Sequence, residues 1–486
     1  MNLKHILTNK IVVYLGSRYL IYGLQFITSL IIAGKLGPYY FGIYGFVLLL
    51  LSYFSQIHLG IPNSLNVLMV HNKSDRAKCD NYVANSLFIY IYFTIVIAVL
   101  YILYCFYGFA PIDKYHVDSY LLSVCVIAIL VYISGVLTCV LRVRNQINQL
   151  SLVTSINAIL NIICVVLFSE EQLIISLIVC LIISNVLTII ISFFNNAIPP
   201  IKEVSINKTT QVEILRKGIW LFFYNTCFYF IVISIRSIIS ANYSIEEFGA
   251  FTFSFTVASA VMMLLDSMQT IMFPKMVDKL SSTELSQVNH SLDIIRVCYV
   301  SAAHFMVYLA MIFFPILTIY ILPEYSNTTI TLNLISLAVL MNANSCGYST
   351  LLIAQNKEKY SAFISVVSLC VNIIIGLLLV HVFHVGFSLV FLATMITYLL
   401  FSFLTVYWGD RLITGYSIKE TIRSFFPLKL FIPFVVAFVI SVLDIHYLAF
   451  IPLIIYLIFN IKDLKRIISY GVIILNNDKI SDIQND

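Results

Sequence analysis

Several ionisable side chains lie inside long apolar stretches of the chain, where a charge is costly. Arg18 and Arg236 each place a guanidinium within such a stretch, and Lys35 stands at the end of the first one. Ionisable residues at membrane depth are rare and usually mark the path of a substrate or an ion. Because a guanidinium makes paired hydrogen bonds to phosphate-like oxyanions, these three cations are candidates for an anion-binding site.

Each cation also has a structural explanation. The Arg18 side chain could extend to the inner headgroups, and the Arg236 side chain could extend to the outer ones. Lys35 stands at the outer end of its stretch, where an interface anchor is the simpler interpretation. For each cation, the functional and the structural explanation both fit the sequence.

Three further groups could take up a proton or another ion. Asp266 is the only carboxylate deep within an apolar stretch, and His58 and His304 lie in two others. Histidine titrates near neutral pH, which suits proton coupling. The structural alternatives are an ion pair for Asp266 and hydrogen-bonded packing for the two histidines.

The remaining polar residues exclude several kinds of chemistry. The sequence contains no evident Ser/His/Asp set and no phosphate-binding GxxxxGK[ST] motif. All of the ten cysteines except Cys79 lie in apolar stretches, and none forms a CxxC pair. We therefore expect buried free thiols, with neither a disulfide nor a metal site. The chain is expected not to be an enzyme and to need no cofactor.

Composition indicates which elements position these residues. Of 486 residues, 60% are hydrophobic and 10% are charged, with a mean hydropathy of +0.97. A soluble domain carries about 25% charged residues, so this chain has too few to cover a water-facing surface. Continuously apolar runs of about 20 residues favour spanning helices over a barrel. We predict an all-α polytopic membrane protein with 12–14 transmembrane helices at 11–33, 41–70, 83–108, 119–140, 150–168, 172–195, 214–240, 248–273, 297–322, 328–354, 360–381, 385–408, 426–443 and 445–461.

Lysine and arginine predict the orientation of these helices. They gather in alternate connections, and Lys35 and Lys114 are the only ones in the opposite set of connections. The positive-inside rule makes the basic side cytoplasmic, so we expect both termini there. This asymmetry explains the net charge of +5 without a nucleic-acid partner. The connections reach only about twenty residues, which leaves no room for a soluble catalytic domain.

The two halves of the chain share weak internal similarity. Phe41-Gly42 corresponds to Phe248-Gly249, 207 positions later. Four further matches share an offset of 211: Leu141 with Leu352, Asn145 with Asn356, Asn161 with Asn372, and Leu167 with Leu378. Six spans return the chain to the same side, so the repeat would be parallel, a common plan among transporters.

We therefore predict two parallel six-helix repeats around a central cavity, plus a C-terminal helix pair. The corresponding domains are residues 1–200 and 201–412 for the two six-helix lobes. Residues 413–486 would hold the two additional helices and a cytoplasmic tail.

Two ordered series of short motifs resemble the Wzx-type O-antigen and polysaccharide flippases of the multidrug/oligosaccharidyl-lipid/polysaccharide (MOP) exporter superfamily. The first series is the segment 34–44 followed by His58-Leu59-Gly60-Ile61. The second consists of the segment 355–359, Val371-Asn372-Ile373, Val385-Gly386-Phe387 and Leu392-Ala393-Thr394. The resemblance covers nearly the whole chain, roughly residues 8–410. One departure is His58, where these proteins often carry an acidic residue.

The resemblance implies a flippase that moves undecaprenyl-diphosphate-linked oligosaccharide across the bacterial inner membrane by alternating access. The cargo would be an O-antigen or a similar surface polysaccharide repeat unit, and the cations would hold its diphosphate. Implied partners are this lipid-linked substrate, the lipid bilayer, H⁺ or Na⁺ as coupling ion, and a polysaccharide polymerase.

The alternative is a multidrug exporter of the same superfamily. An exporter of cationic drugs would favour acidic residues within the spans. Here the deepest charges are the two arginines and Asp266.

Overall fold

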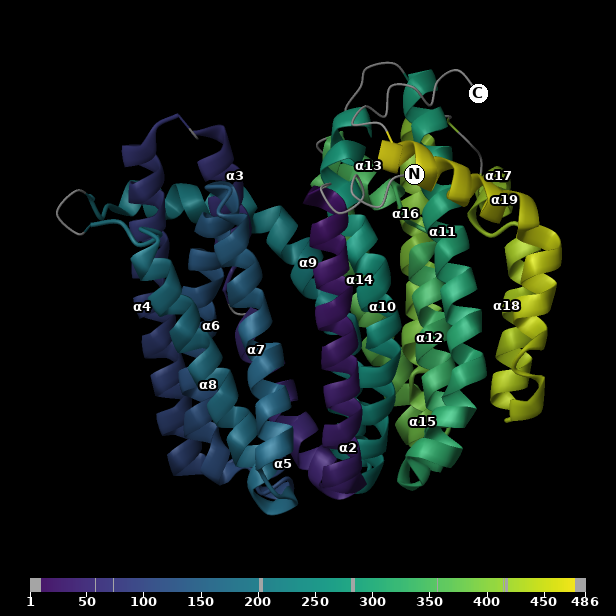
Figure 1. Ribbon diagram of the computed structural model, residues 1–486, viewed down its shortest axis with the longest axis horizontal. Helices are drawn as coiled ribbons and strands as arrows, with labels where there is room; N and C mark the ends of the chain where they lie inside the picture. The colour runs from purple at the N-terminus through teal and green to yellow at the C-terminus, as the bar shows by residue number, and fades with distance from the viewer. Residues whose placement is uncertain are drawn as a thin grey trace. The chain divides into compact units, whose positions relative to one another are not determined.

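The computed structural model describes the backbone of residues 10–56, 58–72, 74–200, 204–280, 285–355, 357–413, 415 and 418–476. Every regular element in these ranges is a helix (Figure 1), which confirms the all-α prediction. Within the helices, some side chains lie outside the description, namely those of 10–18, 147, 171, 217, 218, 221, 262, 264–275, 277–279, 285–287, 423, 424 and 467–476.

The chain forms two compact units, which we describe separately. The N-terminal unit comprises Gly16–Thr252, and the C-terminal unit comprises Phe253 and the helices after it, together with the beginning of α2. Helices α2 (Lys10–Gln56) and α10 (Ile245–Leu280) therefore contribute residues to both units. The lobe boundaries expected at 200/201 and 412/413 stay a prediction.

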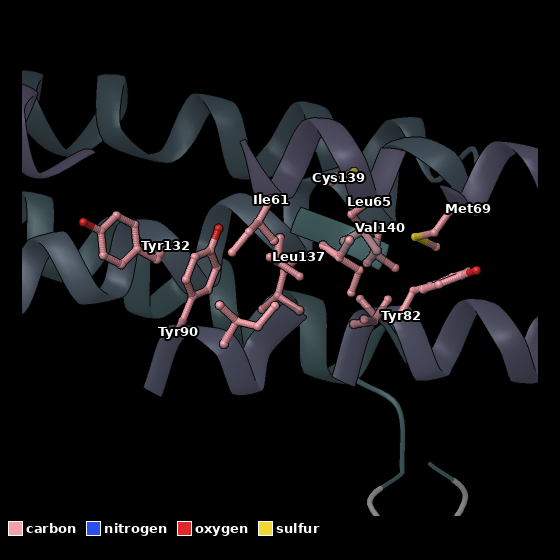
Figure 2. Packing of buried hydrophobic residues seen from close by; sticks show 14 of the residues in the cluster. Ile61, Leu65, Met69, Tyr82, Tyr90, Tyr132, Leu137, Cys139 and Val140 are labelled. Carbon is pink, nitrogen blue, oxygen red and sulfur yellow. The ribbon is translucent and has the colours of Figure 1, made fainter. Parts of the chain in front are cut away.

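The N-terminal unit packs its helices around a buried apolar core. Besides parts of α2 and α10 it contains α3 (Ile61–His71), α4 (Arg76–Tyr107), α5 (Ala110–Lys114), α6 (Asp118–Val143), α7 (Ile147–Leu167), α8 (Glu170–Phe194) and α9 (Lys208–Asn242). Helix α4 contacts α6, and α8 contacts both α6 and α7. In the core, Ile61 and Leu65 of α3 lie with Leu137 and Val140 of α6 (Figure 2).

The C-terminal unit repeats this pattern of neighbours. Its helices are α11 (Leu285–Ile316), η2 (Leu317–Ile321), η3 (Pro323–Thr328), α12 (Thr329–Ala343), α13 (Tyr348–Ala354), α14 (Glu358–His381), α15 (Phe387–Val390), α16 (Leu392–Ile413), α17 (Ile418–Phe425), α18 (Leu428–Val442), η4 (His446–Leu448) and α19 (Ile451–Asn476). Helix α11 contacts α12, and α16 contacts both α12 and α14. Because α14 holds the residues that the offset of 211 pairs with α7, the order of contacts agrees with the internal repeat.

The additional helix pair joins the C-terminal unit through polar contacts. Helices α18 and α19 pack on each other, and the Lys429 ammonium pairs with the Asp463 carboxylate. The Asn460 side chain donates to the carbonyl of Lys429 at 2.9 Å. The Tyr456 hydroxyl donates to the Ser301 carbonyl of α11 at 2.8 Å, which ties α19 to the repeat.

Ten helices of the described chain are long and apolar enough to cross a membrane, or eleven if Pro323–Ala343 and Tyr348–Ala354 form one span. Helix α2 counts once, although two helices meet within it at Gly37. Helices α10 and α18 are outside this count. The sequence prediction of 12–14 spans counted the two parts of α2 separately and included the segments of α10 and α18.

Two spans that the sequence predicted as continuous are broken. The predicted span 41–70 is interrupted between Gln56 and Ile61, where Leu59 and Gly60 have φ angles of 47° and 70°. The predicted span 328–354 bends by 42° between Ala343 and Tyr348, with Gly347 at φ 88°. Such breaks are tolerated at membrane depth where the freed backbone groups are buried in protein or face water.

The connection before α9 is fastened to the start of α4. Asn85 is fully buried and donates to the Ser205 carbonyl at 2.9 Å. Its carbonyl oxygen accepts from the amide of Asn207 at 3.0 Å and from the Gln211 side chain at 3.4 Å. Asn207 in turn caps α9 by accepting from the amide of Thr210 at 2.8 Å.

Candidate functional site

The kink in α2 depends on the Gly37-Pro38 pair. Gly37 has φ 63° and ψ 172°, a conformation that costs glycine little and other residues much more. Pro38 follows as the first residue of the next helical segment, where its missing N–H is no loss. The pair therefore ends one helix and begins another, and it separates Lys35 from the Phe41-Gly42 motif.

The two Phe-Gly pairs that the internal repeat matches lie against each other. A Cβ atom at Gly249 would stand 1.8 Å from the Pro38 carbonyl oxygen and 2.9 Å from the Gly42 nitrogen. A Cβ atom at Gly42 would stand 2.3 Å from the carbonyl oxygen of Ile245. Small residues allow helix backbones to approach this closely. The start of α10 is therefore locked onto α2 by backbone contact.

Aromatic rings pack beside this glycine contact. Phe46 of α2 stacks on Tyr115 with ring centroids 4.2 Å apart. Tyr115 also meets the edge of Phe248 at 5.5 Å. Both Tyr115 and Phe248 are fully buried, so the rings fix the positions of α2, α5 and α10 within the N-terminal unit.

Lys35 caps the end of a neighbouring helix. Its ammonium donates to the carbonyl of Val165 at 2.8 Å and to that of Phe168 at 3.4 Å. The last carbonyls of a helix lack intrahelical donors and carry partial negative charge. The structure thus gives Lys35 a partner at the C-terminus of α7, and its role as a substrate contact stays a prediction.

Lys114 makes the same kind of contact at the end of α9. Its ammonium donates to the carbonyls of Ser240 and Tyr243, each at 2.6 Å. Burial lowers the pKa of Lys114, and the nearby Glu247 carboxylate opposes that shift. Glu247 also accepts from the Ser244 amide at 2.9 Å in a capping box. The two basic residues that the sequence placed outside therefore both donate to carbonyl oxygens at the C-terminal end of another helix.

Arg236 is buried in protein. It lies six residues before the end of α9, or about 9 Å along the axis, and only 6% of the residue is exposed. Its Nη2 donates to the Gly45 carbonyl of α2 at 3.3 Å. The next residue, Ser237, shares a 2.6 Å hydrogen bond with the hydroxyl of Tyr53. In this structure the guanidinium does not extend toward the outer headgroups.

His58 lies in the break between α2 and α3. Its Nδ1 accepts from the amide of Gly60 at 3.0 Å, which satisfies one of the donors that the break frees. The imidazole also meets the edge of Phe222, with ring centroids 6.3 Å apart. His58 therefore stabilises a non-helical turn, a role that the continuous span predicted from the sequence did not include.

His304 lies at the bend between α12 and α13. It is fully buried, with Nδ1 3.0 Å from the Tyr308 hydroxyl and Nε2 3.5 Å from Oδ1 of Asn344. Tyr456 stacks on the imidazole at 6.0 Å. The Nδ2 atom of Asn344 is buried and has no hydrogen-bond partner among the described atoms.

A second polar cluster near this bend escaped the sequence interpretation. Tyr348 donates to Asp410 at 2.5 Å, and the Arg296 guanidinium lies 4.9 Å from the centre of the Tyr348 ring. A Cβ atom at Gly409 would stand 2.4 Å from Tyr348, so the adjacent glycine makes room for the ring. The two hydrogen-bonded residues are 62 positions apart in the sequence. The only local signal of the contact is the glycine that precedes each of them, in the pairs Gly409-Asp410 and Gly347-Tyr348.

An ion pair in the N-terminal unit was also missed. Arg144 lies 2.6 Å from Asp80, which is only 8% exposed, and it also donates to the carbonyl of Asn196. These contacts join the start of α4 to the ends of α6 and α8. The sequence assigned Arg144 only to a basic loop.

The side chains of Arg18 and Asp266 lie outside the described residues, although their backbones belong to α2 and α10. In the N-terminal unit, each of Lys35, His58 and Arg236 has its own partners, and the contacts described above do not join any two of them. Within the described chain, no group of three or more His, Cys, Asp or Glu side chains could hold a metal ion.

Comparison with known proteins identifies both a family and a fold. The family model described as polysaccharide biosynthesis protein matches residues 7–280. No curated protein matches the chain. An inward-facing multidrug resistance MATE family transporter of the MOP superfamily aligns at a TM-score of 0.66 and 14% identity, over 83% of this chain and 96% of that one.

Two further solved structures share the fold. An outward-facing multidrug resistance MATE transporter aligns at a TM-score of 0.56 and 14% identity, over 84% of this chain and 96% of that one. A MOP superfamily transporter from Pyrococcus furiosus aligns at 0.58 and 14%, with the same coverage. The polysaccharide biosynthesis model covers more than half of the chain, so this protein belongs to the polysaccharide biosynthesis protein family and has the fold of MOP superfamily transporters.

Proposed function

We propose that this protein is a flippase for undecaprenyl-diphosphate-linked oligosaccharide, the repeat unit of an O-antigen or similar surface polysaccharide. Membership of the polysaccharide biosynthesis family supports the cargo class, and the transporter fold supports movement across a bilayer. The two six-helix repeats would carry the cargo by alternating access across the bacterial inner membrane, with both termini in the cytoplasm.

The observation that carries the proposal is the guanidinium of Arg236, held at depth inside the protein. An ionised side chain within a spanning helix costs free energy. Reaching the outer headgroups would relieve that cost, yet Arg236 is 6% exposed and donates to the carbonyl of Gly45. A guanidinium kept from water in this way is suited to meet a diphosphate when the helices rearrange. Arg18 and Lys35 would complete the anion-binding set.

Ion coupling would use H⁺ or Na⁺ and the candidates Asp266, His58 and His304. Among these, the surroundings of His304 favour it most, because it is buried beside a helix bend with the acceptor Oδ1 of Asn344 3.5 Å from its Nε2 atom. His58 already supports a turn through the amide of Gly60. A polysaccharide polymerase is the expected downstream partner.

The second candidate function is multidrug export, because MATE family transporters share this fold. The Pyrococcus furiosus transporter is reported with a binding pocket of reverse polarity that suggests a different function. The deep charges Arg18 and Arg236 likewise favour an anionic cargo over cationic drugs in this chain.

Deletion of the gene, followed by analysis of surface glycan, tests the proposal in the cell. We expect loss of the polysaccharide, restoration by the wild-type gene and by Arg216→Ala, and poor restoration by Arg18→Ala and Arg236→Ala. Arg216 is a matched control because it is an exposed arginine on the same helix as Arg236. Unchanged glycan with altered efflux of a cationic dye would favour the multidrug exporter instead.

A further inference from the structure

Two cysteines of the N-terminal unit lie almost within bonding distance. The Sγ atoms of Cys164 in α7 and Cys180 in α8 are 2.9 Å apart. Both residues are buried, at 4% and 5% exposure. Non-bonded heavy atoms prefer separations of about 3.5–4.0 Å, and bonded sulfurs stand about 2.05 Å apart. The two sulfurs are therefore closer than non-bonded atoms usually are. They would have to approach by less than 1 Å to reach the length of a disulfide bond.

The helices around the pair hold the two sulfurs in place. The Cys164 thiol faces the Ser176 carbonyl of α8 at 3.7 Å, and the Cys180 thiol faces the Leu160 carbonyl of α7 at 3.8 Å. Each sulfur thus points across the helix interface toward the opposite helix.

The pair also lies beside the contact that Lys35 of α2 makes with the end of α7. Lys35 donates to the carbonyl of Val165, the residue directly after Cys164. The amide of Phe168, whose carbonyl Lys35 also contacts, donates to the Cys164 carbonyl at 3.0 Å. A disulfide at this point would fix the end of α7, whose carbonyl oxygens accept the hydrogen bonds of Lys35.

We propose that Cys164 and Cys180 form an intramolecular disulfide that staples α7 to α8. Each thiol loses its proton and the pair gives up two electrons as the S–S bond forms. A disulfide-bearing oxidant accepts them and is released as two thiols after a mixed-disulfide intermediate. Cys164 is three residues from the end of α7 that the positive-inside rule places outside, where disulfides persist. In the structure all ten cysteines are free thiols, as the sequence predicted, although Cys105 and Cys370 are exposed and not buried. The proposed disulfide would replace two of these thiols.

Differential alkylation of the full-length protein tests the proposal. Protein from membranes prepared without reductant is denatured in N-ethylmaleimide, reduced with a phosphine, and labelled with deuterated N-ethylmaleimide before peptide mass spectrometry. A second sample is first treated with diamide, a diazene oxidant that takes up two electrons and two protons. We expect deuterated label on Cys164 and Cys180 and ordinary label on Cys139, a control buried to 4% exposure in α6.

The variants check that the two cysteines pair with each other. In Cys180→Ser, Cys164 should carry only ordinary label, and in Cys139→Ser the pair should be labelled as in the wild type. Reduction should also lower the melting temperature of the wild type but leave that of Cys180→Ser unchanged. Ordinary label on both cysteines of the wild type, even after diamide, would overturn the proposal. None of these results depends on what the protein transports.

Discussion

At the scale of single residues, three cations of the N-terminal unit are positioned by backbone carbonyl oxygens. Lys35 and Lys114 cap the C-termini of α7 and α9, and Arg236 donates to the carbonyl of Gly45. Carbonyls at a helix end carry partial negative charge and lack intrahelical donors. Both lysines that the sequence predicts on the outer side of the membrane therefore donate to carbonyl oxygens at helix ends.

Lys35→Met tests this cap. We expect the free energy of unfolding in detergent to fall by about 1 kcal/mol, because charges at helix ends are worth roughly 0.3–2 kcal/mol. Lys35→Arg, which keeps the charge, should lose less. A substrate contact predicts a different result, namely normal stability with impaired transport in the Met variant. Equal stability of all three proteins would remove the capping role.

The sequence could locate these residues but not their partners. Apolar runs placed Arg236 and His304 at depth because hydropathy is a local property. The Gly45 carbonyl lies 191 positions from Arg236, and Asn344 lies 40 positions from His304. Only packing of distant helices brings such groups together, so whether Arg236 extended outward or stayed buried could not be decided from the sequence.

At the scale of elements, glycines allow a close helix contact in the N-terminal unit. Gly42 and Gly249 allow the backbones of α2 and α10 to touch, and the buried rings of Tyr115 and Phe248 close the space beside them. The internal repeat identified the two Phe-Gly pairs from the sequence. That they contact each other follows only from the structure.

Gly249→Ala tests how tightly these helices meet. Its new methyl group would stand 1.8 Å from the Pro38 carbonyl, so the backbones must separate. We expect destabilisation of about 1–3 kcal/mol, the usual cost of overpacking, measured by thermal unfolding in detergent. Gly23→Ala is the control, because Gly23 is an exposed glycine of α2 with nothing within 4 Å of the added atom. That variant should gain about 0.5–1 kcal/mol, and similar behaviour of the two variants would contradict the close contact.

Hydropathy predicted the helices but not the breaks within them. Gly37-Pro38 signals its kink through residue types alone, since glycine adopts φ 63° readily. The break after Gln56 includes Leu59 at φ 47°, a conformation that its type does not favour. The Gly60 amide and the His58 side chain hold that turn together. An apolar run cannot reveal it.

At the scale of the whole molecule, composition was enough to predict the fold class. The low charge content and long apolar runs require buried backbone hydrogen bonds in helices, and the structure is all-helical wherever it is described. Helix α8 contacts α6 and α7 in the N-terminal unit, and α16 contacts α12 and α14 in the C-terminal unit. These corresponding contacts support the parallel repeat that the weak sequence matches suggested. The cargo does not follow from the fold, which multidrug transporters share at 14% identity.

The most direct test of the proposed flippase is a leaflet-exchange assay with purified protein. Liposomes would contain undecaprenyl diphosphate carrying a fluorescent oligosaccharide, and dithionite would quench the label exposed outside. We predict that wild type and Arg216→Ala expose the inner-leaflet pool, and that Arg236→Ala does so about 10–100-fold more slowly, as loss of a charge-assisted hydrogen bond worth about 1.5–3 kcal/mol implies. An inner-leaflet pool that stays protected with wild-type protein, while the same liposomes transport a cationic dye, would contradict the flippase assignment.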